Sequence, residues 1–296
     1  MAYKRLDVKR TTMKVNVSGV CYELNRNTCS ASVTGRKDGY GGNVIIPEMF
    51  VWEGVGYTVV GVRKQAFYDC PNLLSVVLPN SVKRIGDHAF EYCVQLQYVI
   101  LSQRLVGMGV RAFAHCSGLE TIQIPSRVSK IQRETFFGCR SLITVELPEG
   151  LKEIGDGAFM QCCSLRKVIV PERVKMIGDH TFFNCIQLQS IALPSATKRI
   201  GAFAFCNCLR LTDVVLPDQL EWIDEYAFWG CKRILQLVIP LGVKQVKKGT
   251  FLACESLSRL TLNEDVSIVE GAFDDTDEVR YLRTERELVL QFVRTP

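Results

Sequence analysis

A Phe-x-x-Cys motif returns every 23 residues through most of the chain and constrains its fold more than any other feature. A tenth phenylalanine, Phe273, follows the last copy after 22 residues, and Thr276 stands where its cysteine would be. Fixed periods of roughly 20–50 residues are typical of repeat proteins, whose units complete their core only by stacking on neighbours. The sequence therefore predicts a solenoid. The complete copies are Phe67/Cys70, Phe90/Cys93, Phe113/Cys116, Phe136/Cys139, Phe159/Cys162, Phe182/Cys185, Phe205/Cys208, Phe228/Cys231 and Phe251/Cys254.

Each repeat combines short extended segments with a turn. In one representative copy, Val145 and Leu147 alternate with polar residues, as in a strand with one buried face. Pro148 cannot donate a ladder hydrogen bond, so it ends that strand. A second extended segment ends at Ile154, and the segment around Phe159 predicts a helical turn. We therefore expect a β-rich α/β solenoid of ten stacked coils, with parallel strands on one face, short helical turns on the other, and caps at both ends.

The regions outside the regular repeats have patterns of their own. Residues 14–43 alternate apolar and polar residues around a turn at Asn25-Arg26-Asn27, which predicts a β-hairpin cap. Residues 284–293 are amphipathic, with Thr284 as the expected N-cap of a closing helix. The predicted divisions are a flexible basic tail at 1–13, the hairpin cap at 14–43, the solenoid at 44–276 with an insertion near 50–57 in its first coil, and a C-terminal cap at 277–296.

Positive charge is concentrated at the start of the chain. The formal net charge is +5, of which +4 belongs to residues 1–14, so the remainder carries only +1. This balance disfavours nucleic acid as a partner, because such binding depends on many phosphate contacts. No apolar run approaches the roughly 18 residues that span a membrane. No apolar segment follows Lys4-Arg5, so the chain as it stands shows no signal peptide, and from the sequence we expect an intracellular location.

The 23-residue pattern Leu-x-x-Val-x-Leu-Pro-x-x-Val-x-x-Ile-Gly-x-x-Ala-Phe-x-x-Cys resembles the BspA-type, or treponemal, class of leucine-rich repeat. The segment from Val17 to Leu24 is similar to the strand that precedes such arrays in bacterial members. The resemblance covers about residues 14–276. It implies a leucine-rich-repeat solenoid that acts in adhesion or protein binding, at a cell surface or after secretion. It transfers no binding residue to this chain.

Outward-facing residues of the longer strands are expected to form columns, because neighbouring coils lie about 4.8 Å apart. Most residues of the central column are apolar, which favours a binding surface for a protein or glycan. The preference of Val and Ile for strands explains the same residues without any partner. The adjacent column begins at Ser75 and contains Tyr98, the best candidate anchor. The candidate partner-binding residues are Val77, Tyr98, Ile100, Gln123, Glu146, Ile169, Ala192, Val215 and Val238.

A second column is basic and has two interpretations. It can bind a polyanion, such as a sulfated glycan, a nucleic acid or an acidic protein. Stacked lysines also keep a sheet soluble and block pairing at its edges, which would make the column an ordinary solvated face. The candidate polyanion-binding residues are Lys83, Lys152, Lys175, Lys198 and Lys244.

The cysteines of the repeated motif are expected to be buried free thiols that pack as small apolar groups. Their 23-residue spacing does not resemble that of metal ligands. Cys21 and Cys29 lie outside the series, and whether they form a disulfide stays open at this point.

Nothing in the sequence favours catalysis. His88 and His180 share one repeat position but stand four coils apart, roughly 19 Å. No phosphate-binding loop, zinc-protease motif or nucleophile elbow is present. We therefore expect no catalytic residue, cofactor or metal site. The remaining hypotheses are an interaction or adhesion scaffold and a structural spacer without a ligand site.

Overall fold

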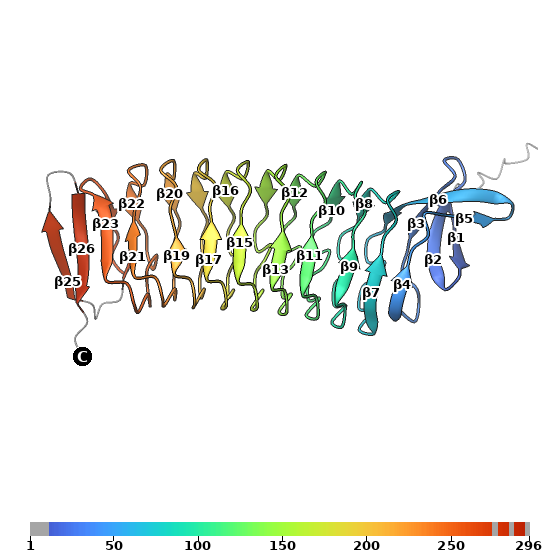
Figure 1. Cartoon of the computed structure of the whole chain (residues 1–296), viewed down its shortest axis with the longest axis horizontal. Coiled ribbons are helices and arrows are strands. Elements are labelled where there is room, and N and C mark those ends of the chain that lie inside the picture. The colour runs from blue at the N-terminus through green and yellow to red at the C-terminus, as the bar shows by residue number, and fades with distance from the viewer. Residues whose placement is uncertain (1–11, 274–277, 284–286, 294–296) are drawn as a thin grey trace, which may run out of the picture.

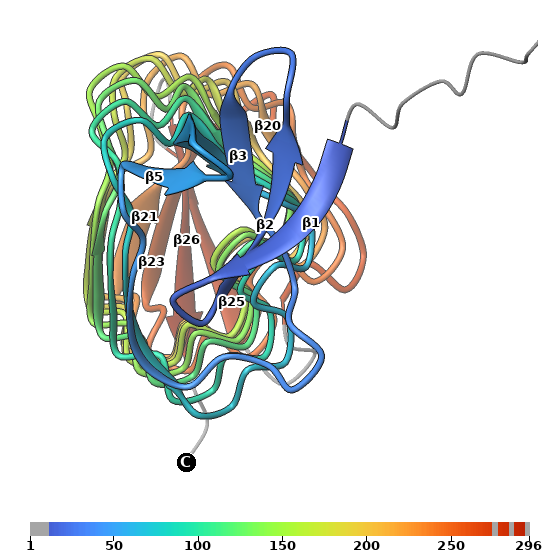
Figure 2. The same ribbon diagram turned by 90° about the vertical axis from the view of Figure 1, so that its right-hand side faces the viewer.

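The computed structural model is an elongated stack of about nine coils of about 23 residues, arranged in one row (Figure 1). It describes residues 12–273, 278–283 and 287–293. Each regular coil contributes a longer strand, usually of three or more residues but of two in Asp213–Val214, and a second strand of two residues. These two sets of strands lie on different sides of the coil (Figure 2). Every element in the described part is a β-strand. The chain is therefore a parallel β-solenoid without helices in that part.

The longer strands form one face of the stack. Where regular coils pair, the register joins each residue to the one 23 positions later, as in Val76 with Val99 and Ile191 with Val214. Hydrogen-bonded pairing is interrupted between β9 and β11, between β13 and β15, and between β19 and β21. These strands are β4 (Gly42–Ile45), β7 (Leu73–Val77), β9 (Tyr98–Ile100), β11 (Thr121–Gln123), β13 (Thr144–Glu146), β15 (Lys167–Ile169), β17 (Ser190–Ala192), β19 (Asp213–Val214), β21 (Gln236–Val238) and β23 (Arg259–Asn263).

The two-residue strands form a second face. In the regular coils each ends on a buried residue, such as Ile154 or Ile177, and turns the residue before it outward. They are β8 (Arg84–Ile85), β10 (Gly107–Met108), β12 (Lys130–Ile131), β14 (Glu153–Ile154), β16 (Met176–Ile177), β18 (Arg199–Ile200), β20 (Trp222–Ile223), β22 (Gln245–Val246) and β24 (Ser267–Ile268).

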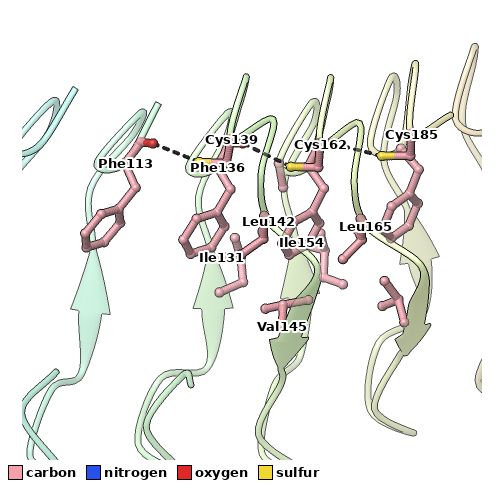
Figure 3. Packing of buried hydrophobic residues seen from close by; sticks show 14 of the residues in the cluster. Phe113, Ile131, Phe136, Cys139, Leu142, Val145, Ile154, Cys162, Leu165 and Cys185 are labelled. Atoms are coloured by element: carbon pink, nitrogen blue, oxygen red, sulfur yellow. Dashed lines mark hydrogen bonds between the residues drawn. The ribbon is translucent and has the colours of Figure 1, made fainter. Parts of the chain in front are cut away.

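A continuous stack of phenylalanine rings runs through the core. From Phe67 to Phe273, successive ring centroids lie 4.8–5.9 Å apart with interplanar angles of 3–13°. Beside this stack, Cys139 donates a hydrogen bond to the carbonyl of Phe113 in the preceding coil (Figure 3). The same thiol-to-carbonyl bond recurs from Cys93 to Cys254 with distances of 2.9–3.3 Å. The repeated motif therefore links adjacent coils through both aromatic packing and hydrogen bonds.

The helical turns predicted around the phenylalanines are wrong. Those segments form tight turns in which residues two before and two after the phenylalanine take positive φ, for example Glu134 at 54° and Gly138 at 71° around Phe136. A right-handed helix requires negative φ at consecutive residues. The left-handed residues therefore stop a helix from forming and let the backbone bond to the next coil, as Phe136 does to Ala158.

The N-terminal end is covered by a small antiparallel unit. Strands β1 (Thr12–Val17), β2 (Val20–Asn25) and β3 (Ser30–Val33) pair in sequence order and lie across the open end of the stack (Figure 2). Strand β3 continues into the array by parallel pairing with β6 (Val55–Val62), which forms an antiparallel hairpin with β5 (Met49–Trp52). Of the basic tail expected at residues 1–13, residues 1–11 lie outside the part of the chain that the structure describes.

The closing helix predicted at 284–293 is wrong where the structure describes it. Glu287–Val293 is strand β26, which pairs antiparallel with both β23 and β25 (Glu278–Arg283). Its expected N-cap, Thr284, lies outside the described residues. Leu288, Leu290 and Phe292 are buried, so the strand supplies an apolar cover for the last coil. Strand β26 occupies the place beside β23 that a further parallel strand would take, and the stack has about nine coils instead of the predicted ten.

Candidate functional site

The face of the longer strands presents the central column predicted from the sequence. Parallel pairing places Val77 beside Ile100 and Ile169 beside Ala192, so residues of neighbouring coils stand side by side. The exposed fractions are 53% for Ile100, 63% for Ile169, 81% for Val215 and 64% for Val238, whereas Val77 is only partly exposed. The array thus holds large apolar side chains in water at regular intervals.

Two polar residues divide this column. Gln123 donates a hydrogen bond of 2.9 Å to Glu146 in the next coil, and both side chains are exposed. The N-terminal part of the column contains Ile100, with Tyr98 exposed beside it. The C-terminal part runs from Ile169 through Ala192, Val215 and Val238. The candidate residues therefore form two apolar patches separated by a polar pair.

The structure adds exposed apolar residues that the repeat pattern did not reveal. Ile45 pairs with Val77 and extends the N-terminal patch by one coil. The long insertion in the first coil hides this relationship in the sequence, since Ile45 stands 32 residues before Val77. Leu235 and Leu241 are exposed around Val238 and enlarge the C-terminal patch. They occupy repeat positions that are mostly polar elsewhere, and only their departure from that pattern could have marked them.

One expected outward residue is covered by the neighbouring coil. Ser75 begins the column that contains Tyr98, but its side chain is buried and donates a hydrogen bond of 2.7 Å to Asn43. Asn43 lies on β4 directly opposite Ser75 in the register. The irregular first coil therefore covers the start of this column.

The C-terminal patch is also hollowed. Strand β19 pairs with β17, and β21 pairs with β23, but no pairing joins β19 to β21 among the described strands. A shallow depression of about 570 Å³ lies there. Val215, Leu216, Val238 and Pro240 form its apolar lining, and Asp218 and Arg259 add charges. This combination of exposed apolar side chains and a depression is typical of protein-binding surfaces.

The basic column exists, but it is interrupted. Lys83, Lys152, Lys175, Lys198 and Lys244 are all exposed. Val106, Ser129 and Glu221 occupy the same repeat position in the other coils. Glu221 accepts an ion pair of 2.9 Å from Lys198. Three lysines therefore stand in consecutive coils from 152 to 198, followed by one acidic residue and a further lysine.

Most cysteines of the ladder lie in a buried environment that suppresses their reactivity. None of the thirteen cysteines, all of which lie in the described part of the chain, forms a disulfide, and the ladder cysteines from Cys70 to Cys254 are buried. Burial raises the pKa of the Cys139, Cys162 and Cys208 thiols well above the ordinary range, which suppresses the reactive thiolate. Cys21 and Cys29 form no disulfide with each other. Cys21 lies opposite Thr34 on the hairpin, whereas Cys29 lies in the turn between β2 and β3.

The histidines serve the packing of the turns. His115 stacks on Tyr92 at a ring-centroid distance of 4.6 Å and meets Phe137 edge-on. His180 stacks on Phe203, and His88 bonds to Glu91. In the part of the chain that the structure describes, no group of three or more His, Cys, Asp or Glu side chains could hold a metal ion. Nor do the described residues include an apolar helix of membrane-spanning length.

Comparison with known families matches the chain to the BspA-type leucine-rich-repeat region, with six copies over residues 61–188 and 175–288. The chain belongs to this family. A leucine-rich repeat protein from Bacteroides ovatus has 25% identity and a TM-score of 0.67, covering 88% of this chain and 79% of its own. The leucine-rich repeat protein of T. pallidum has 33% identity and a TM-score of 0.60, covering 68% of this chain and 92% of its own.

The fold extends to more distant proteins. The pneumococcal vaccine antigen PcpA shares 17% identity with this BspA-type protein, with a TM-score of 0.52 over 88% of this chain and 91% of its own. A comparison with curated proteins found no match.

Proposed function

We propose that this BspA-type protein is a non-enzymatic interaction scaffold that binds a protein or glycan partner on the face of its longer strands. The observation that supports the proposal is the exposed apolar column of Ile100, Ile169, Val215 and Val238. Exposing large apolar side chains to water costs free energy, about 25 cal/mol for each Å² of apolar surface. A partner that covers the column recovers this free energy.

The scaffold suits this role because its surface is fixed by its interior. The phenylalanine stack and the thiol-to-carbonyl bonds hold adjacent coils in one register. Side chains on the outer face are then presented at constant spacing, about 4.8 Å from coil to coil. A preorganised surface loses little conformational freedom on binding, which favours affinity. Adhesion is the use of such a surface that the family resemblance implies.

The test compares the wild type with charge variants on arrays of purified proteins and glycans. The triple variant Ile169→Glu, Val215→Glu, Val238→Glu should lose at least about tenfold in affinity for a partner of the long-strand face, because each carboxylate would have to be desolvated. The matched control is Met49→Glu, Val51→Glu, which alters equally exposed apolar residues on β5. Unchanged binding by the triple variant would contradict the proposal. Absence of any ligand would favour a structural spacer.

A further inference from the structure

Trp222 stands out on the opposite set of strands, those of two residues. It lies on β20 with 51% of its surface exposed. The corresponding residues of the other coils are mostly charged, small or polar, and Trp222 is the aromatic member of this column in the described residues. The residues at this position in the other two-residue strands from β8 to β22 are Arg84, Gly107, Lys130, Glu153, Met176, Arg199 and Gln245. Tryptophan offers a large apolar face and an N–H donor, which makes it a frequent anchor for ligands.

A hollow of about 480 Å³ adjoins this indole. Its lining includes Trp222, Gly242, Lys244, Gln245 and Lys247. Gly242 adds no side chain, and none would fit, since a Cβ there would lie 2.4 Å from the carbonyl oxygen of Leu220. The hollow is within the size range of small-ligand sites, about 300–1,000 Å³. The close approach of Gly242 to Leu220 thus excludes any side chain at this position of the lining.

The cations around the hollow are not equally engaged. The ammonium of Lys247 and the guanidinium of Arg199 both bond to Asp224, and Lys198 pairs with Glu221. Lys244 instead donates to the carbonyl of Leu241 at 3.1 Å. Among the described residues, no carboxylate lies within ion-pairing distance of Lys244. Its charge is therefore available to a ligand that occupies the hollow.

The positive charge continues beyond the hollow. Lys152 and Lys175 belong to the same column as Lys198 and Lys244, and neither has an ion-pair partner in the described part of the chain. Consecutive coils space these ammonium groups at about 4.8 Å intervals along the backbone. A ligand that extends from the hollow along this column would pass Glu221, which pairs with Lys198, and would then meet Lys175 and Lys152.

These features together fit an acidic saccharide. The apolar C–H face of a sugar ring packs on an indole, and its carboxylate or sulfate groups pair with lysines through charge-assisted hydrogen bonds. Glu221 and Gln245 supply acceptors for sugar hydroxyls. A single-stranded nucleic acid fits less well, because it requires successive aromatic platforms and this column has one. The low net charge outside residues 1–14 also disfavours nucleic acid as the ligand.

We propose that the Trp222 hollow, with Lys244 and the lysine column from 152 to 198, binds an anionic saccharide that carries carboxylate or sulfate groups. This site lies on the face of the two-residue strands and is separate from the long-strand face (Figure 2). Its residues are distinct from those of the apolar column. The two proposals therefore stand or fall independently.

The test is calorimetry with four probes of similar length: a heparin hexasaccharide, a hexagalacturonate, neutral cellohexaose and a thymidine oligonucleotide. Binding of either acidic saccharide, with no binding of cellohexaose at the same concentration, supports the site, and the two acidic probes distinguish sulfate from carboxylate. Lack of binding by both, equal binding of cellohexaose, or tighter binding of the oligonucleotide would overturn it.

Single substitutions test which residues contact the saccharide. Trp222→Ala and Lys244→Gln should each weaken saccharide binding about tenfold, since each removes a contact of roughly 1.5 kcal/mol. The matched control is Lys83→Gln, which removes an exposed lysine of the same column seven coils away from Lys244. This variant should change affinity less than about twofold. Equal losses at Lys83 and Lys244 would mean unspecific attraction and contradict the assignment. The triple variant of the long-strand face should bind the saccharide as the wild type does.

Discussion

The thiol of Cys139 donates a hydrogen bond of 3.1 Å to the carbonyl of Phe113, which lies 26 residues earlier and one coil away. This bond lies beside the stacked rings of Phe113 and Phe136, so one motif joins neighbouring coils in two ways. The sequence indicated only that the cysteine fills space in the core as a small apolar group. The hydrogen bond gives it a second role. It anchors each turn to the coil before it.

Replacing Cys139 with alanine should lower the stability of the protein by about 1–3 kcal/mol, because it removes both a buried side chain and a hydrogen bond. Cys163→Ala is the matched control, since Cys163 is only partly buried and stands outside the ladder. It should change stability by less than about 0.5 kcal/mol. Urea unfolding followed by circular dichroism measures both. Equal shifts for the two variants would show that the ladder bond contributes nothing.

Alkylation should separate the ladder thiols from the others. Burial raises the pKa of Cys139 and Cys185, so these thiols stay protonated at neutral pH and lack the reactive thiolate. Cys29 is exposed and should react first with iodoacetamide under native conditions. Raising the pH to about 9 should speed modification of exposed thiols and leave Cys139 and Cys185 unmodified. Mass spectrometry of peptides gives the sites. Early labelling of Cys139 would contradict this account.

Asp224 should make stability depend on pH. Burial alone would raise its pKa, but hydrogen bonds from Lys247 and Arg199 outweigh burial and hold the pKa below the ordinary value. A depressed pKa in the folded state stabilises the protein above the unfolded value of about 4, and this stabilisation is lost as the pH falls further. Asp224→Asn should cost about 1 kcal/mol at neutral pH, because Arg199 is partly exposed and the pair is screened.

The same variant should flatten the loss of stability below a pH of about 4. Glu255→Gln provides the control, since Glu255 forms an exposed ion pair with Lys232. Its pH dependence should follow the wild type. Unfolding midpoints measured across the acid range decide the matter, and a wild-type slope in Asp224→Asn would refute the role given to this carboxylate.

Two glycines with different surroundings test the close packing of the coils. A Cβ on Gly86 would lie 2.4 Å from the backbone nitrogen of Lys64, whereas a Cβ on Gly107 would have no atom within 4 Å. Gly86→Ala should therefore destabilise by at least about 2 kcal/mol, because backbone must move. Gly107→Ala should be neutral or stabilise by up to about 1 kcal/mol, since it restricts the unfolded chain. Comparable urea midpoints for the two variants would be inconsistent with the structure.

The regular part of the fold could be predicted from the sequence because the 23-residue period of the Phe-x-x-Cys motif is unbroken there. The interval between cysteines fixes the pairing of Val76 with Val99 and of each later coil with the next. The prediction fails where tertiary contacts decide local structure. Residues 287–293 have the pattern of an amphipathic helix, yet Leu290 pairs with Leu260 in a strand because the edge of β23 needs a hydrogen-bonding partner. The turns around Phe136 bond to the next coil, which no local pattern reveals.

The candidate surfaces likewise contain some residues that the sequence predicts and others that only the structure reveals. Ile100, Ile169 and Val238 are predictable as outward residues, since each stands one place from a buried strand residue. Ile45 is not, because the insertion in the first coil removes it from the period. The Trp222 hollow depends on Gly242 and Lys244 from the following coil. Such juxtapositions arise from the spacing between coils and become visible only in three dimensions.

The most direct test of the binding face is photo-crosslinking from single positions, using a partner identified on the arrays. A benzophenone side chain is placed at Val215, which is 81% exposed on the long-strand face, or at Val51, which is 65% exposed on β5. The account predicts a covalent adduct with the partner from position 215 and none from position 51. An adduct from position 51 alone, or equal yields from both positions, would contradict the assignment of the long-strand face as the binding surface.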